Sequence, residues 1–251
     1  MNAAPSFHSH SLIAAWAEGA RFISTAGRDD FVMTLSSGVA WEPDPVGLRR
    51  LDQAAMKFSW ERPSSVSEMI LPAACEAENL NAADSIEQGL IMLGRARKRG
   101  IRFSGWKHTY FERMVGKSQD RDGNRRNFRR NTLLTVIEKL NLWNRNAEAA
   151  CYIHTSLESD TFRTRGGPCL QYVQFRAHGD KQLDVIGLYR AHDYGNKALG
   201  NLIGLNRLGR FVGHHTGRRL NAVAIVSLHP FTDHKHRLLK FANHVAPIPR
   251  L

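Results

Sequence analysis

The sequence predicts a single α/β domain over residues 1–251, and three observations lead to that prediction. The chain is long enough for one substantial domain with a buried core, and it shows no internal repeat. Residues 170–175 and 182–188 have the alternation of β-strands and are expected to pair through the polar segment between them. Apolar residues recur at helical spacing over 199–212 and 81–100.

The elements of the N-terminal half follow from apolar spacing and from residues that stop regular structure. In chain order they are a loose tail (1–10), a helix (11–23), a strand or hairpin edge (31–45), a helix within 63–76, an amphipathic helix (81–100), a polar loop (117–131), a helix (132–143) and a strand (149–155). Ser11 is the expected N-cap of the first helix, and Gly100 ends the amphipathic one.

The C-terminal half supplies the elements that carry candidate site residues. The helix over 199–212 has Asn201 in its first turn, and residues 220–231 form a buried strand that delivers His229 at its far end. Cys169 is expected at the start of the first of the two paired strands, and Arg190 at the end of the second.

Composition limits the class of protein and its partners. Cys75, Cys151 and Cys169 are few and lack metal-type spacing, which favours a reducing cytoplasm and no metal site. With no signal peptide and no apolar run long enough to span a bilayer, a soluble cytoplasmic protein without membrane contact is expected. A formal charge of +12 favours anionic partners, either nucleotides or nucleic acid.

The most basic stretch, residues 117–131, is the candidate for nucleic-acid contact. Arginines recur between Arg121 and Arg130, with Phe128 among them, a pattern that suits phosphate binding and base stacking. A solvated charged surface is the alternative. We expect this stretch to be a mobile loop.

The segment from Gly166 to Phe231 holds the residues that could surround a small polar ligand. Cys169 follows a Gly-Gly-Pro turn that can present its thiol at the start of a strand. Arg190 and Asp193 follow the end of the next strand, where loops carry chemistry. The alternative is structural: a cysteine that opens a strand packs as a small apolar residue, and a histidine at a strand end is solvated.

These residues resemble the thymidylate synthases and pyrimidine hydroxymethylases. The resemblance rests on Pro168-Cys169, Gln174-Phe175, YRAHD at 189–193, Asn201 eight positions after Asp193, and His229-Pro230-Phe231. It covers about a quarter of the chain. The family fold implies a mixed, bent sheet flanked by helices, and a homodimer formed by sheets packing back to back.

The resemblance also implies a role for each residue. Cys169 would attack C6 of a uracil ring, Arg190 would hold the nucleotide phosphate and keep the thiol ionised, Asp193 would meet 5,10-methylenetetrahydrofolate, Asn201 would read the pyrimidine edge, and His229 would bind the sugar. Phe231 stands where the family has a tyrosine. The residue types suit this chemistry, because C5 of uracil becomes nucleophilic only after an addition at C6, and a thiolate adds reversibly.

Two further residues enter through the resemblance. Arg28, in a polar loop, corresponds to an arginine that clamps the phosphate, and Glu68 corresponds to a catalytic glutamate in an early helix. Glu68 lies beside Met69 and Ile70, and a carboxylate in apolar company suits proton transfer. A solvated Arg28 and an exposed Glu68 are the alternatives.

The leading expectation is one-carbon transfer, methylation or hydroxymethylation, to C5 of a dUMP-like pyrimidine nucleotide through a covalent Cys169 adduct. Where the family has a pair of phosphate-binding arginines, this chain has only Arg145 close by, with Ala147 and Glu148 following. The chain also ends soon after His229. These departures motivate a second expectation, a nucleotide-binding protein without folate chemistry. Nucleic-acid binding through Arg121–Arg130 is the third.

Overall fold

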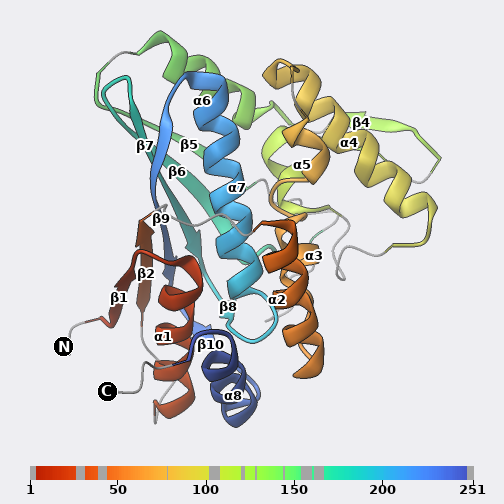
Figure 1. Cartoon of the computed structure of the whole chain (residues 1–251). Coiled ribbons are helices and arrows are strands. Elements are labelled where there is room, and N and C mark those ends of the chain that lie inside the picture. The colour runs from red at the N-terminus through yellow and green to blue at the C-terminus, as the bar shows by residue number, and fades with distance from the viewer. Residues whose placement is uncertain are drawn as a thin grey trace.

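The protein is built around a mixed six-stranded sheet (Figure 1). The computed structural model describes residues 4–26, 32–38, 44–77, 79–101, 108–119, 122–127, 129–143, 145–153, 160 and 167–247. The strands of this sheet are β1 (Ser6–Ser9), β2 (Met33–Gly38), β5 (Ala147–Tyr152), β6 (Leu170–His178), β7 (Gln182–Tyr189) and β9 (Arg219–Ser227), in the spatial order β1-β2-β9-β7-β6-β5.

The pairing confirms the predicted α/β class with a mixed sheet. β6 and β7 pair antiparallel, as the sequence predicts, and β7 pairs parallel with β9, which is reached through a long helix. β1 and β2 are parallel, whereas β2 and β9 run antiparallel. The antiparallel pairing of β6 and β7 places the start of β6 beside the end of β7, with Leu170 opposite Tyr189. Cys169 and Arg190 therefore lie side by side.

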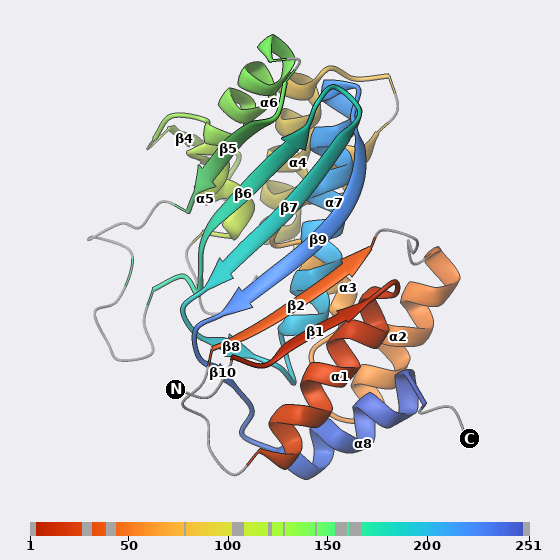
Figure 2. The ribbon, with the colours of Figure 1, turned by 90° about the vertical axis from the view of Figure 1, so that its left-hand side faces the viewer.

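The helices gather on one side of the sheet (Figure 2). They are α1 (Leu12–Thr25), α2 (Pro45–Lys57), α3 (Pro63–Ser67), the 3₁₀ helix η1 (Ala73–Glu76), α4 (Ala82–Lys98), α5 (Tyr110–Val115), α6 (Thr132–Leu142), α7 (Ala198–Thr216) and α8 (Lys235–Val245). In Figure 2 the strands β6, β7 and β9 face the viewer with none of these helices in front of them.

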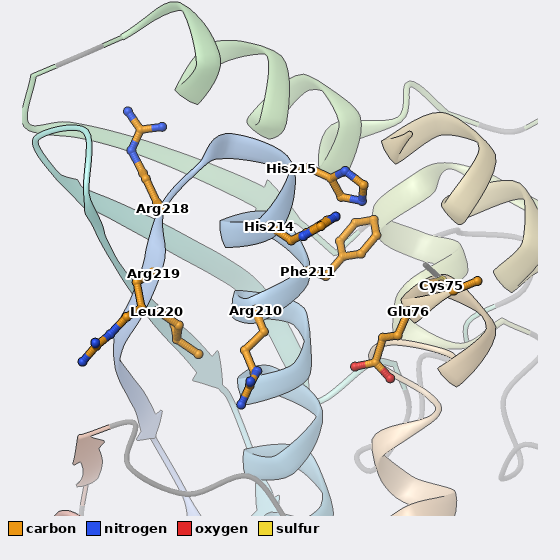
Figure 3. A pocket seen from close by; sticks show the side chains of 10 residues that line it. Cys75, Glu76, Arg210, Phe211, His214, His215, Arg218, Arg219 and Leu220 are labelled. Atoms are coloured by element: carbon orange, nitrogen blue, oxygen red, sulfur yellow. The ribbon is translucent and has the colours of Figure 1, made fainter. Parts of the chain in front are cut away.

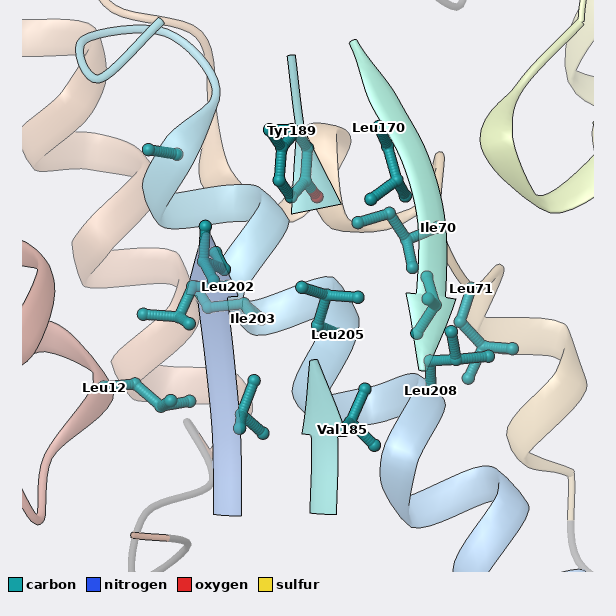
Figure 4. Packing of buried hydrophobic residues seen from close by; sticks show 14 of the residues in the cluster. Leu12, Ile70, Leu71, Leu170, Val185, Tyr189, Leu202, Ile203, Leu205 and Leu208 are labelled. Atoms are coloured by element: carbon teal, nitrogen blue, oxygen red, sulfur yellow. The ribbon is translucent and has the colours of Figure 1, made fainter. Parts of the chain in front are cut away.

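Helix α7 is the element on which the core is built, because it is buried along nearly its whole length. Figure 4 shows Leu202, Leu205 and Leu208 of α7 among Val185 and Tyr189 of β7. Glycines on α7 allow close approach on both sides. A Cβ at Gly200 would lie 2.5 Å from the Cβ of Val66 in α3, and one at Gly209 would lie 2.7 Å from Val185 Cγ2.

The expectation of a loose tail over residues 1–10 is wrong for the part that the structure describes. Ser6–Ser9 forms an edge strand parallel to β2, with Phe7 opposite Leu35. Phe7 packs on Phe22 of α1 at a ring-centroid distance of 5.5 Å, and His8 Nδ1 lies 2.9 Å from Ser36 Oγ. This short strand has only one large apolar residue, Phe7, so its sequence has no alternation of apolar and polar residues from which a strand could be predicted.

Two other expectations are corrected in detail. The helix expected within 63–76 is two elements, because α3 ends at Ser67 and η1 begins after Pro72. Pro72 has no amide hydrogen and disfavours the helical conformation at Leu71, so a continuous helix cannot pass through it. Part of the stretch expected as a mobile loop is a two-stranded ribbon of β3 (Lys117–Gln119) and β4 (Arg125–Asn127). Residues 120, 121 and 128 lie outside the described residues.

Among the described residues, no helix combines the length and the apolar character that crossing a bilayer requires.

Candidate functional site

Cys169 lies in a turn that Arg190 holds in place. Gly167 has φ of +81°, a conformation that glycine adopts without the strain of a Cβ, and Pro168 follows it. Arg190 donates from Nη2 to Gly167 O at 3.0 Å and from Nε to Pro168 O at 3.2 Å, and its amide donates to Cys169 O at 2.9 Å. The guanidinium is therefore fixed beside the half-buried thiol.

The pKa of Cys169 is shifted in the direction opposite to the expectation that Arg190 keeps the thiol ionised. Burial raises the pKa of Cys169, and the nearby Asp193 raises it further, whereas Arg190 and Lys197 lower it only in part. The balance favours the neutral thiol near pH 7. Catalysis would need a partner that removes the proton once a ligand is bound.

Asp193 organises the loop that leads into α7. Its Oδ1 accepts hydrogen bonds from the amides of Gly195 at 2.9 Å and Asn196 at 3.1 Å, and its Oδ2 accepts one from Asn196 Nδ2 at 2.8 Å. A carboxylate has about four lone-pair positions, so one acceptor position remains on Oδ2.

Asn201 is buried in the first turn of α7 and contacts His192 of the short strand β8 (His192–Asp193). Asn201 Nδ2 lies 3.1 Å from His192 Nε2, and His192 Nδ1 lies 2.9 Å from Ser227 Oγ. Asn201 Oδ1 has no hydrogen-bond partner among the described residues. A buried amide oxygen without a partner is suited to accept a hydrogen bond from an N–H or O–H group of a ligand.

His229 reaches the same end of the sheet through backbone pairing. Its carbonyl accepts from the amide of His192 at 2.9 Å, just before β10 (Pro230–Phe231) pairs parallel with β8. The His229 ring is exposed and stacks on Phe231 at a centroid distance of 5.7 Å. Phe231 thus supports the histidine by packing.

The sequence analysis gives no role to three residues next to this group, which are Tyr110, Tyr189 and His192. Tyr110 is half-buried, and burial together with the nearby Cys169 raises its pKa. Tyr189 lies under the His192 ring, and burial and its neighbours Tyr110 and Cys169 raise its pKa as well. A tyrosine that opens a helix and a histidine in a two-residue strand carry no periodic signal, so the pattern could not have identified either residue.

The structure does not bring Glu68 to Cys169. Its Oε1 accepts from Arg207 Nη1 at 2.9 Å, and its Oε2 accepts from the amide of Ala73 at 2.9 Å. Arg207 also binds Glu76, at 2.7 Å. Among the described residues these contacts join Glu68 to an ion-pair cluster on α7, rather than to the thiol. Arg28, the predicted phosphate clamp, lies outside the described residues.

A separate cavity of about 760 Å³ lies at the C-terminal half of α7 (Figure 3). Its lining consists of Cys75, Glu76, Ala77, Arg210, Phe211, His214, His215, Arg218, Arg219 and Leu220. Figure 3 shows His214 and His215 directed toward the side of η1, whereas Arg218 and Arg219 point away from them. None of the predicted site residues lines this cavity, so it is distinct from the Cys169 group.

Within the described ranges, no group of three or more His, Cys, Asp or Glu side chains is arranged to hold a metal ion. Neither the family models nor the curated proteins contain a match to this chain.

Proposed function

We propose that this protein transfers a one-carbon unit to C5 of a pyrimidine nucleotide, through a covalent adduct between Cys169 and C6 of the ring. The supporting observation is that Cys169, Arg190, Asn201 and His229, which are far apart in the sequence, lie at the same end of the sheet. The thiol of Cys169 suits attack on an electrophilic ring carbon, and the guanidinium of Arg190 suits an anionic phosphate. The amide of Asn201 suits the polar edge of a pyrimidine, and the imidazole of His229 suits a sugar hydroxyl.

The chemical step begins with loss of the Cys169 proton. The thiolate forms a bond to C6, and the electron pair of the C5–C6 double bond moves through C4 onto O4. The developing charge on O4 needs a donor, and the second N–H of Asn201 Nδ2 can supply it. C5 is then an enolate carbon that can attack an electrophilic one-carbon unit. The C5 proton and the carrier would then leave, which gives an exocyclic methylene on C5. Addition of a hydride from the carrier, for a methyl product, or of water, for a hydroxymethyl product, would expel the Cys169 thiolate and restore the C5–C6 double bond.

One described residue, Asp193, has a free acceptor position that suits the implied cofactor, 5,10-methylenetetrahydrofolate. The remaining acceptor position on Asp193 Oδ2 suits an N–H donor of such a molecule. The cofactor would supply the one-carbon electrophile. Asp193 is the described residue that would hold it, while its other oxygen keeps the loop before α7 in place.

Intact mass after incubation with 5-fluoro-dUMP and methylenetetrahydrofolate tests the proposal. We expect a mass increase equal to nucleotide plus folate, which Cys169→Ser abolishes and Cys75→Ser retains, because Cys75 lies in the separate cavity. An adduct that persists in Cys169→Ser would refute the covalent mechanism.

The burial of the thiol supports a second candidate function, nucleotide binding without chemistry. Because burial raises the pKa of Cys169, the thiol is poorly prepared for attack unless the ligand changes its surroundings. Calorimetric binding of dUMP together with no adduct in the mass experiment would favour this candidate.

Nucleic-acid binding remains a third proposal. Arg126, Arg129 and Arg130 are exposed at and after β4, consistent with contact to phosphates. Replacing these three arginines by alanine should weaken oligonucleotide binding and flatten its salt dependence. Unchanged binding would exclude this use of the segment.

The resemblance also implies a homodimer, and we propose that it forms through the helix-free face of the sheet. The strand registers align Tyr172, Leu188 and Val226 in one row across β6, β7 and β9. Gln174, Ile186 and Ala224 form the next row. All six side chains are only partly buried in the single chain, while their neighbours along each strand face the core. A second copy packed on this face would cover them.

A further inference from the structure

His192 is a buried side chain with an aromatic ring stacked on its imidazole, a second aromatic ring in a T-shaped contact, and a polar partner at each of its ring nitrogens. The imidazole is stacked on Tyr189 at a centroid distance of 4.0 Å and an interplanar angle of 0°, and it meets Tyr194 edge-on at 5.3 Å. Ser227 Oγ and Asn201 Nδ2 lie at its two nitrogens, at 2.9 and 3.1 Å. The ring therefore has one position and one orientation.

The protonation of His192 follows from its burial and its partners. Burial lowers the pKa of His192 to about 3, so the ring is neutral near pH 7. A neutral imidazole has one donor and one acceptor nitrogen. Because an amide NH₂ group can only donate, Nε2 accepts from Asn201, and the proton sits on Nδ1, from which it is donated to Ser227 Oγ.

This arrangement determines which atom of Asn201 is available to a ligand. With Nδ2 committed to His192, turning the amide over would place Oδ1 against the acceptor nitrogen, which is unfavourable while the ring keeps this tautomer. Oδ1, which has no partner among the described residues, is then a fixed acceptor.

Resting on the proposed function, we propose that His192, backed by Ser227, is a positioning residue that holds the Asn201 amide with Oδ1 as acceptor, and thereby makes the site select uracil-type over cytosine-type nucleotides. A uracil carries an N3–H group that can donate a hydrogen bond to Oδ1. The N3 of cytosine is itself an acceptor, so the two lone pairs would face each other.

Calorimetric dissociation constants for dUMP and dCMP test this inference in the wild type, His192→Phe and His192→Gln. Phenylalanine keeps the stacking on Tyr189 and removes the acceptor, whereas the glutamine carbonyl can accept from Asn201 Nδ2 again. We expect the wild type to prefer dUMP by at least tenfold, His192→Phe to reduce the ratio to about one to three, and His192→Gln to restore most of it.

The outcomes separate the inference from the proposed function. A wild type that binds neither nucleotide contradicts the proposed function and removes the basis of the inference. A wild type that binds both equally, or a folded His192→Phe protein that keeps the full preference, overturns the inference and leaves nucleotide binding intact. Thermal melting of each variant establishes that it is folded.

Nitrogen-15 NMR of the histidine rings tests the tautomer without relying on any variant's activity. The signal that disappears in His192→Gln is that of His192. We expect it to show a protonated Nδ1 and a bare Nε2 between pH 6 and 8. A protonated Nε2 would reverse the orientation of the amide and overturn the inference, even if the phenylalanine variant did not fold.

Discussion

At the scale of single residues, two opposing effects act on Cys169. Removing a thiolate from water is unfavourable, and at this half-buried position that effect outweighs the attraction of Arg190 and Lys197. Arg190 contributes geometry as well as charge, because its guanidinium binds the carbonyls of the turn that carries the thiol. The candidate site thus combines a thiol of fixed position with a protonated resting state.

Arg190→Met should slow alkylation of Cys169 by iodoacetamide. Loss of the nearest cation raises the pKa of the thiol further, and a rise of one unit lowers the thiolate fraction about tenfold near pH 8. In the wild type the rate should keep rising above pH 9, because the thiol pKa exceeds its usual value. The measurement is intact mass against time over a pH series.

Arg176→Met is the matched control, since Arg176 is an exposed arginine paired with Glu148 on the sheet face. It should leave the alkylation rate unchanged. An Arg190→Met protein that melts like the wild type and reacts equally fast would show that Arg190 does not act on the thiol.

Residue patterns in the sequence indicated part of this site and missed the rest for physical reasons. Cys169, Arg190 and Asn201 could be identified because each follows a turn, ends a strand or begins a helix. His192 could not, because its proposed role depends on how its ring stacks on Tyr189 and on a contact to Ser227, which is 35 positions later in the chain. Glu68 lies among apolar residues as the sequence suggests, but its carboxylate turns to Arg207, a residue of a distant helix.

At the scale of elements, α5 depends on a buried ion pair at its N-terminus. Thr109 and Glu112 form a reciprocal capping box, and Glu112 is also bound by both terminal nitrogens of Arg97 in α4, each at 2.6 Å. The Glu112 side chain is fully buried. The pair links α4 to the helix that begins with Tyr110, next to Cys169.

Arg97→Met should lower the free energy of unfolding by about 3–5 kcal/mol, because it leaves the Glu112 carboxylate buried without its cation. Chemical denaturation monitored by circular dichroism measures this change. Arg95→Met, two positions earlier on the exposed side of α4, is the control and should change stability by less than about 0.5 kcal/mol. Equal effects of the two substitutions would contradict a specific role for the pair.

Element boundaries were less predictable than element types. The long helices α4 and α7 show clear apolar spacing, and the structure confirms both. Strand β1 and the ribbon of β3 and β4 are only three or four residues long, so their existence depends on partners rather than on pattern.

At the scale of the whole molecule, the sheet has one face packed on helices and one face open, as Figure 2 shows. The open face carries aliphatic side chains at its centre and opposite charges toward one end, where Glu148 lies opposite Arg176 and Arg176 opposite Asp184. In a two-fold dimer the same surface of both subunits meets, so a surface that carries both positive and negative side chains can pair with itself.

Ile186→Asp, near the centre of this face, should convert the proposed dimer into a monomer, because burying an unpaired carboxylate between two sheets is costly. Light scattering coupled to size-exclusion chromatography measures the mass. Met56→Asp on α2 is the control, because Met56 is 52% exposed and lies on a helix rather than on the sheet face. A wild type that is monomeric at all concentrations would rule out the dimer.

The position of β9 between β2 and β7 has a consequence for the order in which the chain can fold. β2 ends at Gly38, yet its partner is the strand Arg219–Ser227, so the register that joins Met33 to Ser227 spans most of the chain. During synthesis, the edge of β2 stays uncovered until the chain has been made as far as Ser227. The N-terminal strands therefore cannot join the rest of the sheet before β9 has been made, and a ribosome-bound chain that stops before β9 would expose this edge to other chains.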